Sequence, residues 1–128
     1  MTLRIGDKLT KQMAVEPQHL ACNIGSGSVE VLSTPMVAAL MEGAACESIA
    51  PCLAEGESSV GTMMNVNHTS ATPVGMEVRA ESTVTAVAGR KVTFEIVAYD
   101  EAGEIGRAVH ERFIIKTERF LEKTYDKL

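Results

Sequence analysis

The chain has 128 residues, 45% hydrophobic and 23% charged, a composition typical of one globular domain, which we expect to span residues 1–128. The formal net charge of −5 argues against nucleic acid as a partner, because binding phosphates needs a basic face. No apolar run is long enough for a membrane span, and no secretory signal is recognisable at the N-terminus. We therefore expect a cytoplasmic protein without a membrane partner.

The three cysteines, Cys22, Cys46 and Cys52, have neither CxxC nor metal-ligand spacing. In a cytoplasmic chain we expect them to be reduced thiols, with no metal bound and no cofactor required. Aromatic residues make up only 4% of the chain, so aliphatic side chains must build the core. Such a core is thin for a lone domain, which favours burial against a second subunit.

In chain order, a weakly alternating stretch at residues 6–15 predicts a strand, and a flexible Gly-Ser loop follows at residues 25–28. The strongest helix signal begins at Thr34, a good N-cap, with Pro35 at the first helical position. The helix itself is expected over residues 36–50. Because it is apolar nearly all round, we expect it to be buried.

Period-two alternation then predicts four strands joined by short turns, at about residues 60–68, 76–87, 92–98 and 105–116. On the first of these strands, Val60 and His68 are expected to face the helix and Gly61 the opposite side. For the charged tail at residues 117–128 we expect one short helix. Short turns imply an antiparallel sheet, and an apolar helix needs a curved sheet around it. The predicted class is α+β.

Glu42 and His68 stand out because each places an ionisable group on an apolar face. The residues one helical turn from Glu42 are all apolar, and burying a carboxylate without a partner is costly. An imidazole that shares a hydrogen bond with such a carboxylate suits a general base. Three plainer roles stay open: an N-cap for Thr34, a strand-end histidine for His68, and a structural carboxylate for Glu42.

A longer pattern joins these residues. It comprises VLSTPM at 31–36, LMEGAA at 40–45, SVGT at 59–62, His68, ATPVG at 71–75 and HER at 110–112. This pattern resembles the fluoroacetyl-CoA thioesterase-like branch of the hotdog superfamily, roughly from residue 29 to residue 112. The resemblance implies a hotdog-fold homodimer with active sites at the subunit interface. It also implies hydrolysis of a small or short-chain acyl-CoA to CoA and a carboxylate, with coenzyme A present only as part of the substrate.

The resemblance also assigns roles. The branch uses a Thr/Glu/His set, and the matching positions are Thr34, Glu42 and His68 as catalytic residues. Gly61 and Arg112 match positions that line the acyl site and bind substrate. The fluoroacetyl-specific enzyme has Phe side chains that form a lid before the helix, whereas this chain has Gly-Ser-Gly-Ser there. Selectivity for fluoroacetyl groups is therefore not expected.

The spacing of Thr34 and Glu42 limits how this set can work. Eight residues of helix separate them by about 12 Å along the axis, at ~1.5 Å per residue, so they cannot bond directly within one chain. We expect the set to be completed across the dimer; the alternative is that substrate and His68 span the gap. His68, oriented by Glu42, would activate either the Thr34 hydroxyl or a water, and both routes stay open. Candidate cations for the CoA phosphates are Arg79, Arg90, Lys91, Arg112 and Lys116.

Three other functions are alternatives to a thioesterase. A non-catalytic acyl-CoA sensor would keep the cleft without turnover. A hotdog enoyl-CoA hydratase is disfavoured because no Asp accompanies His68. A purely structural dimer leaves Glu42 unexplained.

Overall fold

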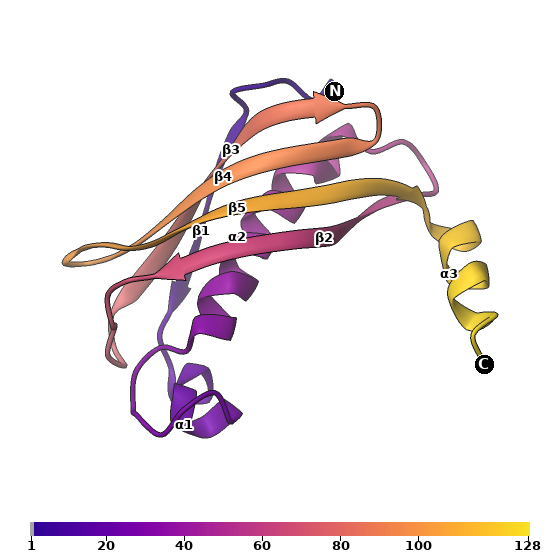
Figure 1. Ribbon diagram of the computed structural model, residues 1–128. Helices are drawn as coiled ribbons and strands as arrows, with labels where there is room; N and C mark the ends of the chain where they lie inside the picture. Colours follow the sequence, from indigo (N-terminus) through magenta and orange to yellow (C-terminus); the bar gives the residue numbers. More distant parts are fainter. Residues whose placement is uncertain (1) are drawn as a thin grey trace.

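The computed structural model describes residues 2–128 and contains one five-stranded antiparallel sheet with a long helix, α2, along one face (Figure 1). The sheet order is β1-β3-β4-β5-β2. The elements in chain order are β1 (Lys8–Ala14), η1 (Pro17–His19), α1 (Ala21–Ile24), α2 (Thr34–Ile49), η2 (Ala50–Cys52), β2 (Glu57–His68), β3 (Glu77–Ala88), β4 (Lys91–Asp100), β5 (Gly103–Lys116) and α3 (Thr117–Tyr125). The predicted α+β hotdog architecture is confirmed.

The start of α2 differs from the prediction by one residue. Ser33 is the N-cap: its backbone is extended, and its side-chain oxygen accepts a hydrogen bond from the Met36 N–H at 3.3 Å. Thr34 is the first helical residue instead of the cap. Its hydroxyl is therefore not needed to satisfy the helix end and can bond elsewhere.

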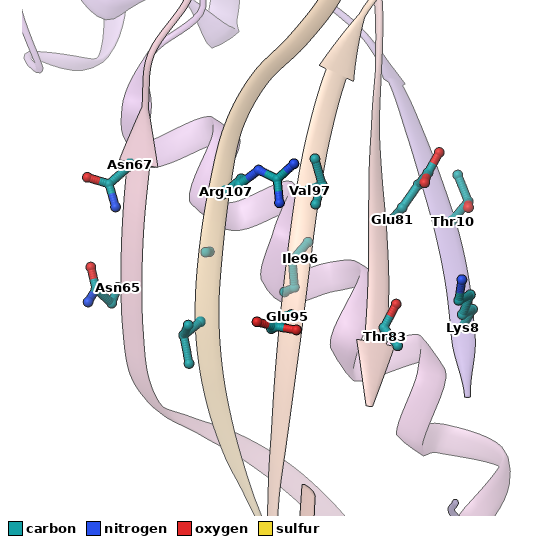
Figure 2. Close-up of a pocket in the computed structure, with 12 residues that line it drawn as sticks. Lys8, Thr10, Asn65, Asn67, Glu81, Thr83, Glu95, Ile96, Val97 and Arg107 are labelled. Atoms are coloured by element: carbon teal, nitrogen blue, oxygen red, sulfur yellow. The ribbon is translucent and has the colours of Figure 1, made fainter. Parts of the chain in front are cut away.

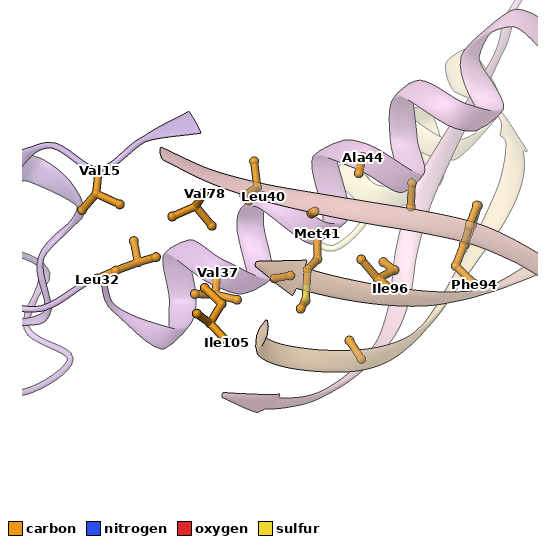
Figure 3. Close-up of a cluster of buried hydrophobic side chains, with 14 of the residues drawn as sticks. Val15, Leu32, Val37, Leu40, Met41, Ala44, Val78, Phe94, Ile96 and Ile105 are labelled. Carbon is orange, nitrogen blue, oxygen red and sulfur yellow. The ribbon is translucent and has the colours of Figure 1, made fainter. Parts of the chain in front are cut away.

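One side of α2 fills the core. The buried residues of the helix are Val37, Leu40, Met41, Ala44, Ala45 and Ile49, and Figure 3 shows several of them facing side chains of the sheet. Phe94 and Ile96 of β4 pack in the same cluster. The opposite side of α2, with Ala39 and Cys46, is exposed in the single chain. The prediction that the whole helix is buried was wrong for one chain, because the sheet covers only one of its sides.

A β-bulge in β2 changes which residues face α2. Gly61 pairs with Arg112 of β5, but the next pair is Met63 with Glu111, so Thr62 is an extra residue. A bulge of one residue transfers the following side chains to the other face. Gly61 therefore points toward α2 together with His68, and the predicted placement of Gly61 on the opposite side was wrong.

The outer face of the sheet is polar. Figure 2 shows a shallow hollow there, lined by side chains that point away from α2, among them Lys8, Asn65, Glu95 and Arg107. None of the predicted site residues lines it. The predicted site residues instead lie on the inner side, between the sheet and α2.

β2 forms one edge of the sheet, and its outer edge has no strand partner within residues 2–128. It is 12 residues long. Long, uncovered edge strands are ready to pair with another chain. Across the same residues, no helix is long and apolar enough to cross a membrane.

Candidate active site

The start of α2 and the end of β2 bring Thr34 and His68 together. The Thr34 Oγ1 atom lies 2.8 Å from the His68 Nδ1 atom, a hydrogen-bond distance. The two residues are 34 positions apart in the sequence. A hydroxyl held against an imidazole is the basic arrangement for activating an oxygen nucleophile.

The other ring nitrogen of His68 is the unusual one. Nε2 is buried and has no hydrogen-bond partner among residues 2–128. A neutral imidazole has one donor and one acceptor nitrogen. If Nδ1 accepts a hydrogen bond from the Thr34 hydroxyl, the ring hydrogen is on Nε2. A buried donor without an acceptor is costly, and an unpartnered polar group of this kind is typical of a functional site.

Glu42 lies in a second cluster with Gly61 and Arg112. Its Oε2 atom is 3.8 Å from the Nη1 atom of Arg112, and a Cβ atom added to Gly61 would lie only 2.6 Å from that same oxygen. The Arg112 side chain is 7% exposed, whereas that of Glu42 is 47% exposed. The carboxylate thus touches a buried cation on one side and is open on the other, where a second chain can contact it.

Arg112 is held firmly from β2. Its Nε donates to the Ser59 hydroxyl at 3.0 Å, and its Nη2 donates to the Ser59 carbonyl at 2.9 Å. The remaining nitrogen, Nη1, faces Glu42 and the ring of His110. A guanidinium with two nitrogens already bonded keeps one fixed orientation, so the position of its charge is set before any ligand enters.

His110 is the site residue that sequence reasoning did not single out. It is fully buried on β5 beside Arg112. Burial lowers the pKa of His110, and the positive charge of Arg112 lowers it further. The signal was present: Ala108, His110 and Arg112 alternate on the inner face of one strand. Two polar residues in such a series indicate a polar cluster under the sheet.

The structure therefore forms two clusters instead of one. Thr34 and His68 meet at the beginning of α2, and Gly61, Glu42 and Arg112 meet near its middle. No hydrogen bond or ion pair joins Glu42 to His68 within residues 2–128. The candidate cations outside these clusters are each paired with a carboxylate: Arg79 with Glu81, Arg90 and Lys116 with Glu57, and Lys91 with Glu111.

Comparison with known proteins identifies the family. Residues 15–118 match the family described as fluoroacetyl-CoA-specific thioesterase. The curated fluoroacetyl-CoA thioesterase of Streptantibioticus cattleyicolor is 34% identical, over 98% of this chain and 94% of its own length. This chain belongs to the fluoroacetyl-CoA-specific thioesterase family. The predicted family and the predicted thioester hydrolase activity are thereby confirmed.

Solved structures agree with this assignment. A crystal structure of the fluoroacetyl-CoA thioesterase has a TM-score of 0.94 and 33% identity, covering 100% of this chain and 99% of its own. A thioesterase superfamily member of Thermus thermophilus has a TM-score of 0.86 and 26% identity, covering 98% and 97% of the two chains. A variant of the fluoroacetyl-CoA enzyme was crystallised with fluoroacetate and CoA.

Proposed function

We propose that this protein hydrolyses a small or short-chain acyl-CoA thioester to CoA and a carboxylate. The observation that carries the proposal is the 2.8 Å contact between the Thr34 hydroxyl and His68 Nδ1, next to a ring nitrogen that needs an acceptor. Family membership supports thioester hydrolysis and disfavours the non-catalytic sensor. No metal or cofactor is part of the proposed reaction.

In the proposed reaction His68 acts as general base. Its Nδ1 atom takes a proton from the attacking oxygen, which is the Thr34 hydroxyl or a water in its place. That oxygen bonds to the thioester carbon, the carbon–sulfur bond breaks, and the CoA thiolate receives the proton back from His68. On the Thr34 route, water then hydrolyses the acyl-threonine by the same proton path. The N-terminal end of α2 lies beside Thr34, and its positive dipole end favours the oxyanion that forms.

Glu42 of a second copy is the proposed acceptor for His68 Nε2. Two β2 edges that pair antiparallel around a two-fold axis at Asn65 place Val66 of one copy opposite Met64 of the other. Because Thr62 is the extra residue of the bulge, the same register places His68 opposite Gly61. Residues opposite each other in such a pair point to the same face, about 5 Å apart. Glu42 adjoins Gly61, so its open side then reaches His68. The proposed enzyme is thus a homodimer with shared sites.

The proposed substrate carries a small acyl group, without selectivity for fluoroacetyl. The loop before α2 is exposed from Gly25 to Glu30, and it contains no aromatic residue. A lid of aromatic side chains is therefore absent from this loop. The space beside the thioester stays open to solvent, which suits small acyl groups of varied chemistry.

An assay of thiol release over a panel of acyl-CoAs tests the proposed function. The purified protein is incubated with acetyl-, fluoroacetyl-, propionyl-, butyryl- and hexanoyl-CoA, and free CoA is measured with a thiol reagent. We expect catalysed release from at least one short-chain member, with fluoroacetyl-CoA not preferred by orders of magnitude. Binding of acyl-CoA by calorimetry without release from any of them would support the sensor instead.

The close contact of Gly61 with Glu42 leads to a prediction. In Gly61→Ala the new methyl group would lie 2.6 Å from Glu42 Oε2, so the carboxylate must move away. A misplacement of about 1 Å in an active site can lower the rate by roughly 10²-fold, and we expect a loss of kcat of that order with the melting temperature nearly unchanged. The change is repeated in a Glu42→Gln background. Because the methyl group acts through Glu42, its additional effect there should be small; an equal loss in both backgrounds would contradict this.

A further inference from the structure

His110 is a fully buried histidine that the proposed reaction does not use. Its ring stacks on Phe94 of β4, with 6.0 Å between ring centroids. Its Nδ1 atom lies 2.7 Å from the main-chain carbonyl oxygen of Met63, immediately after the bulge in β2. A carbonyl oxygen only accepts, so Nδ1 carries the hydrogen.

The second ring nitrogen of His110 faces Arg112. Its Nε2 atom is 3.3 Å from Arg112 Nη1, and a guanidinium only donates, so Nε2 accepts with its lone pair. Both contacts therefore require a neutral ring. Burial and the charge of Arg112 lower the pKa of His110, while the Met63 carbonyl and the Glu42 carboxylate act in the opposite direction.

These bonds complete the support of Arg112. Ser59 takes Nε and Nη2, and His110 takes one hydrogen of Nη1. The other side of Nη1 faces the Glu42 carboxylate, with 3.8 Å between Nη1 and Oε2. Without His110 the guanidinium would keep its two bonds to Ser59 but lose the contact that holds Nη1 on the Glu42 side.

We propose that His110 is a positioning residue of this enzyme: its neutral ring holds the Arg112 guanidinium against the Glu42 carboxylate and ties both to the bulge that turns Gly61 toward α2. The inference rests on the proposed function, in which Glu42 serves the reacting groups. His110 itself touches neither substrate nor the Thr34–His68 pair. Its effect is on where the Glu42 carboxylate lies and on how rigidly it is held.

Two variants separate the two hydrogen bonds of His110. Asn places an amide N–H where Nδ1 lies and keeps the bond to Met63, but it is too short to accept from Arg112. Gln places an oxygen near the position of Nε2 and keeps that acceptor. We expect His110→Asn to lower kcat roughly ten- to a hundredfold with KM little changed, because a hydrogen bond to a charged group is lost, and His110→Gln to restore most of it.

Phe94→Leu is the matched control for packing. It removes the ring that stacks on His110 while leaving every polar contact in place, so it lowers the melting temperature without the fall in kcat. Equal kcat in the Asn and Gln variants, or a loss that merely follows the melting temperature, would overturn the inference. If His110→Asn does not fold, the wild-type ring decides: nitrogen-15 NMR shifts that place the hydrogen on Nε2 would overturn the inference, because Nε2 could then not accept from Arg112.

NMR separates failure of this inference from failure of the proposed function. A wild-type protein that releases no thiol contradicts the function alone. Nitrogen-15 shifts of the His110 ring then decide the inference, with hydrogen on Nδ1 and the lone pair on Nε2 expected. In the same spectra the Arg112 side-chain N–H signals should be retained in His110→Gln and broadened in His110→Asn. A doubly protonated ring near neutral pH would contradict the assigned role.

Unfolding at two pH values gives an independent readout. The charged groups that face His110 are Arg112 on its own strand and Glu42 from α2; β4 contributes only the Phe94 ring and β2 the Met63 carbonyl. Because the pKa of His110 is lower in the folded state, its contribution to stability is complete above the unfolded value of ~6.5 and is lost as pH falls below it. The wild type should lose more stability than His110→Gln between about pH 7.5 and 5.5; an equal loss would contradict the neutral ring.

Discussion

Replacement of Glu42 by Gln is expected to lower kcat for acyl-CoA hydrolysis by about 10²- to 10⁴-fold, the usual contribution of a positioned acid–base group. Gln keeps the size of the side chain and its place beside Gly61 and Arg112, so the fold should be retained. It carries no charge to hold the His68 ring in its reactive tautomer. KM is expected to change little, because no bond to the CoA part of the substrate is assigned to Glu42.

Glu47→Gln is the matched control for that change. Glu47 lies on the same helix, but its carboxylate bonds to Lys11 at 2.8 Å on the surface and is 53% exposed. A surface ion pair of this kind contributes about 0–1 kcal/mol, so kcat and melting temperature should stay close to the wild type. Thiol release with short-chain acyl-CoAs and circular dichroism are measured for both variants. A Glu42→Gln enzyme with wild-type kcat would exclude Glu42 from the reaction.

Much of this architecture is predictable because local signals agree with the final fold. The Ser33-Thr34-Pro35 start defines a helix with its N-terminus, and period-two alternation defines each long strand. The short turns then leave only an antiparallel sheet. Glu42 and His68 were identifiable from the same periodicity, since an ionisable group among apolar neighbours is visible without a structure. Thr34 needed the resemblance, because a threonine at a helix start has an ordinary capping role.

The placement of Gly61 could not be predicted in this way. Strand periodicity assumes one residue per partner, and the extra residue Thr62 breaks that count between Gly61 and Met63. The one local signal is Gly61 itself, because an isolated glycine inside a strand pattern suggests a bulge, but it does not say which residue is the extra one. The effect of the bulge is large, because it places Gly61, which has no side chain, against the Glu42 carboxylate. The contact between Gly61 of β2 and Glu42 of α2 depends on how the helix packs on the sheet, and the alternation of residues along one strand does not contain that information.

His110, in the polar cluster under β5, was not predicted for a different reason. The resemblance assigns Arg112 to the acyl site, but no role was predicted for His110, although both residues continue the alternation of the buried face. The structure shows why two polar residues are tolerated there. Each ring nitrogen of His110 and each guanidinium nitrogen of Arg112 has a hydrogen-bond partner. The partners are the Ser59 hydroxyl and carbonyl, the Met63 carbonyl, and the two side chains themselves. Satisfied polar groups can be buried at modest cost.

The second large effect is expected from His68→Asn. The Asn side-chain oxygen can occupy the position of Nδ1 and accept the Thr34 hydroxyl, but it cannot take the proton during the reaction. We expect kcat to fall by about 10²- to 10⁴-fold, with the melting temperature nearly unchanged. His19→Asn is the matched control, because His19 lies outside both clusters and uses its Nδ1 atom to accept from the Glu16 N–H, a bond that Asn can reproduce. A fall of similar size in His19→Asn would point to a structural effect.

Mixing the two inactive variants decides whether sites are shared between copies. If Glu42 serves His68 of the other chain, a heterodimer of Glu42→Gln and His68→Asn chains contains one site with every wild-type residue and one site with both changes. Random assembly makes half of the dimers mixed, so about a quarter of the wild-type activity should return on unfolding and refolding the chains together. If all residues act within one chain, every site keeps one defect and no activity returns. Wild type refolded with the double variant gives the converse result: a shared site leaves the mixed dimer inactive, whereas separate sites leave one of its two chains fully active.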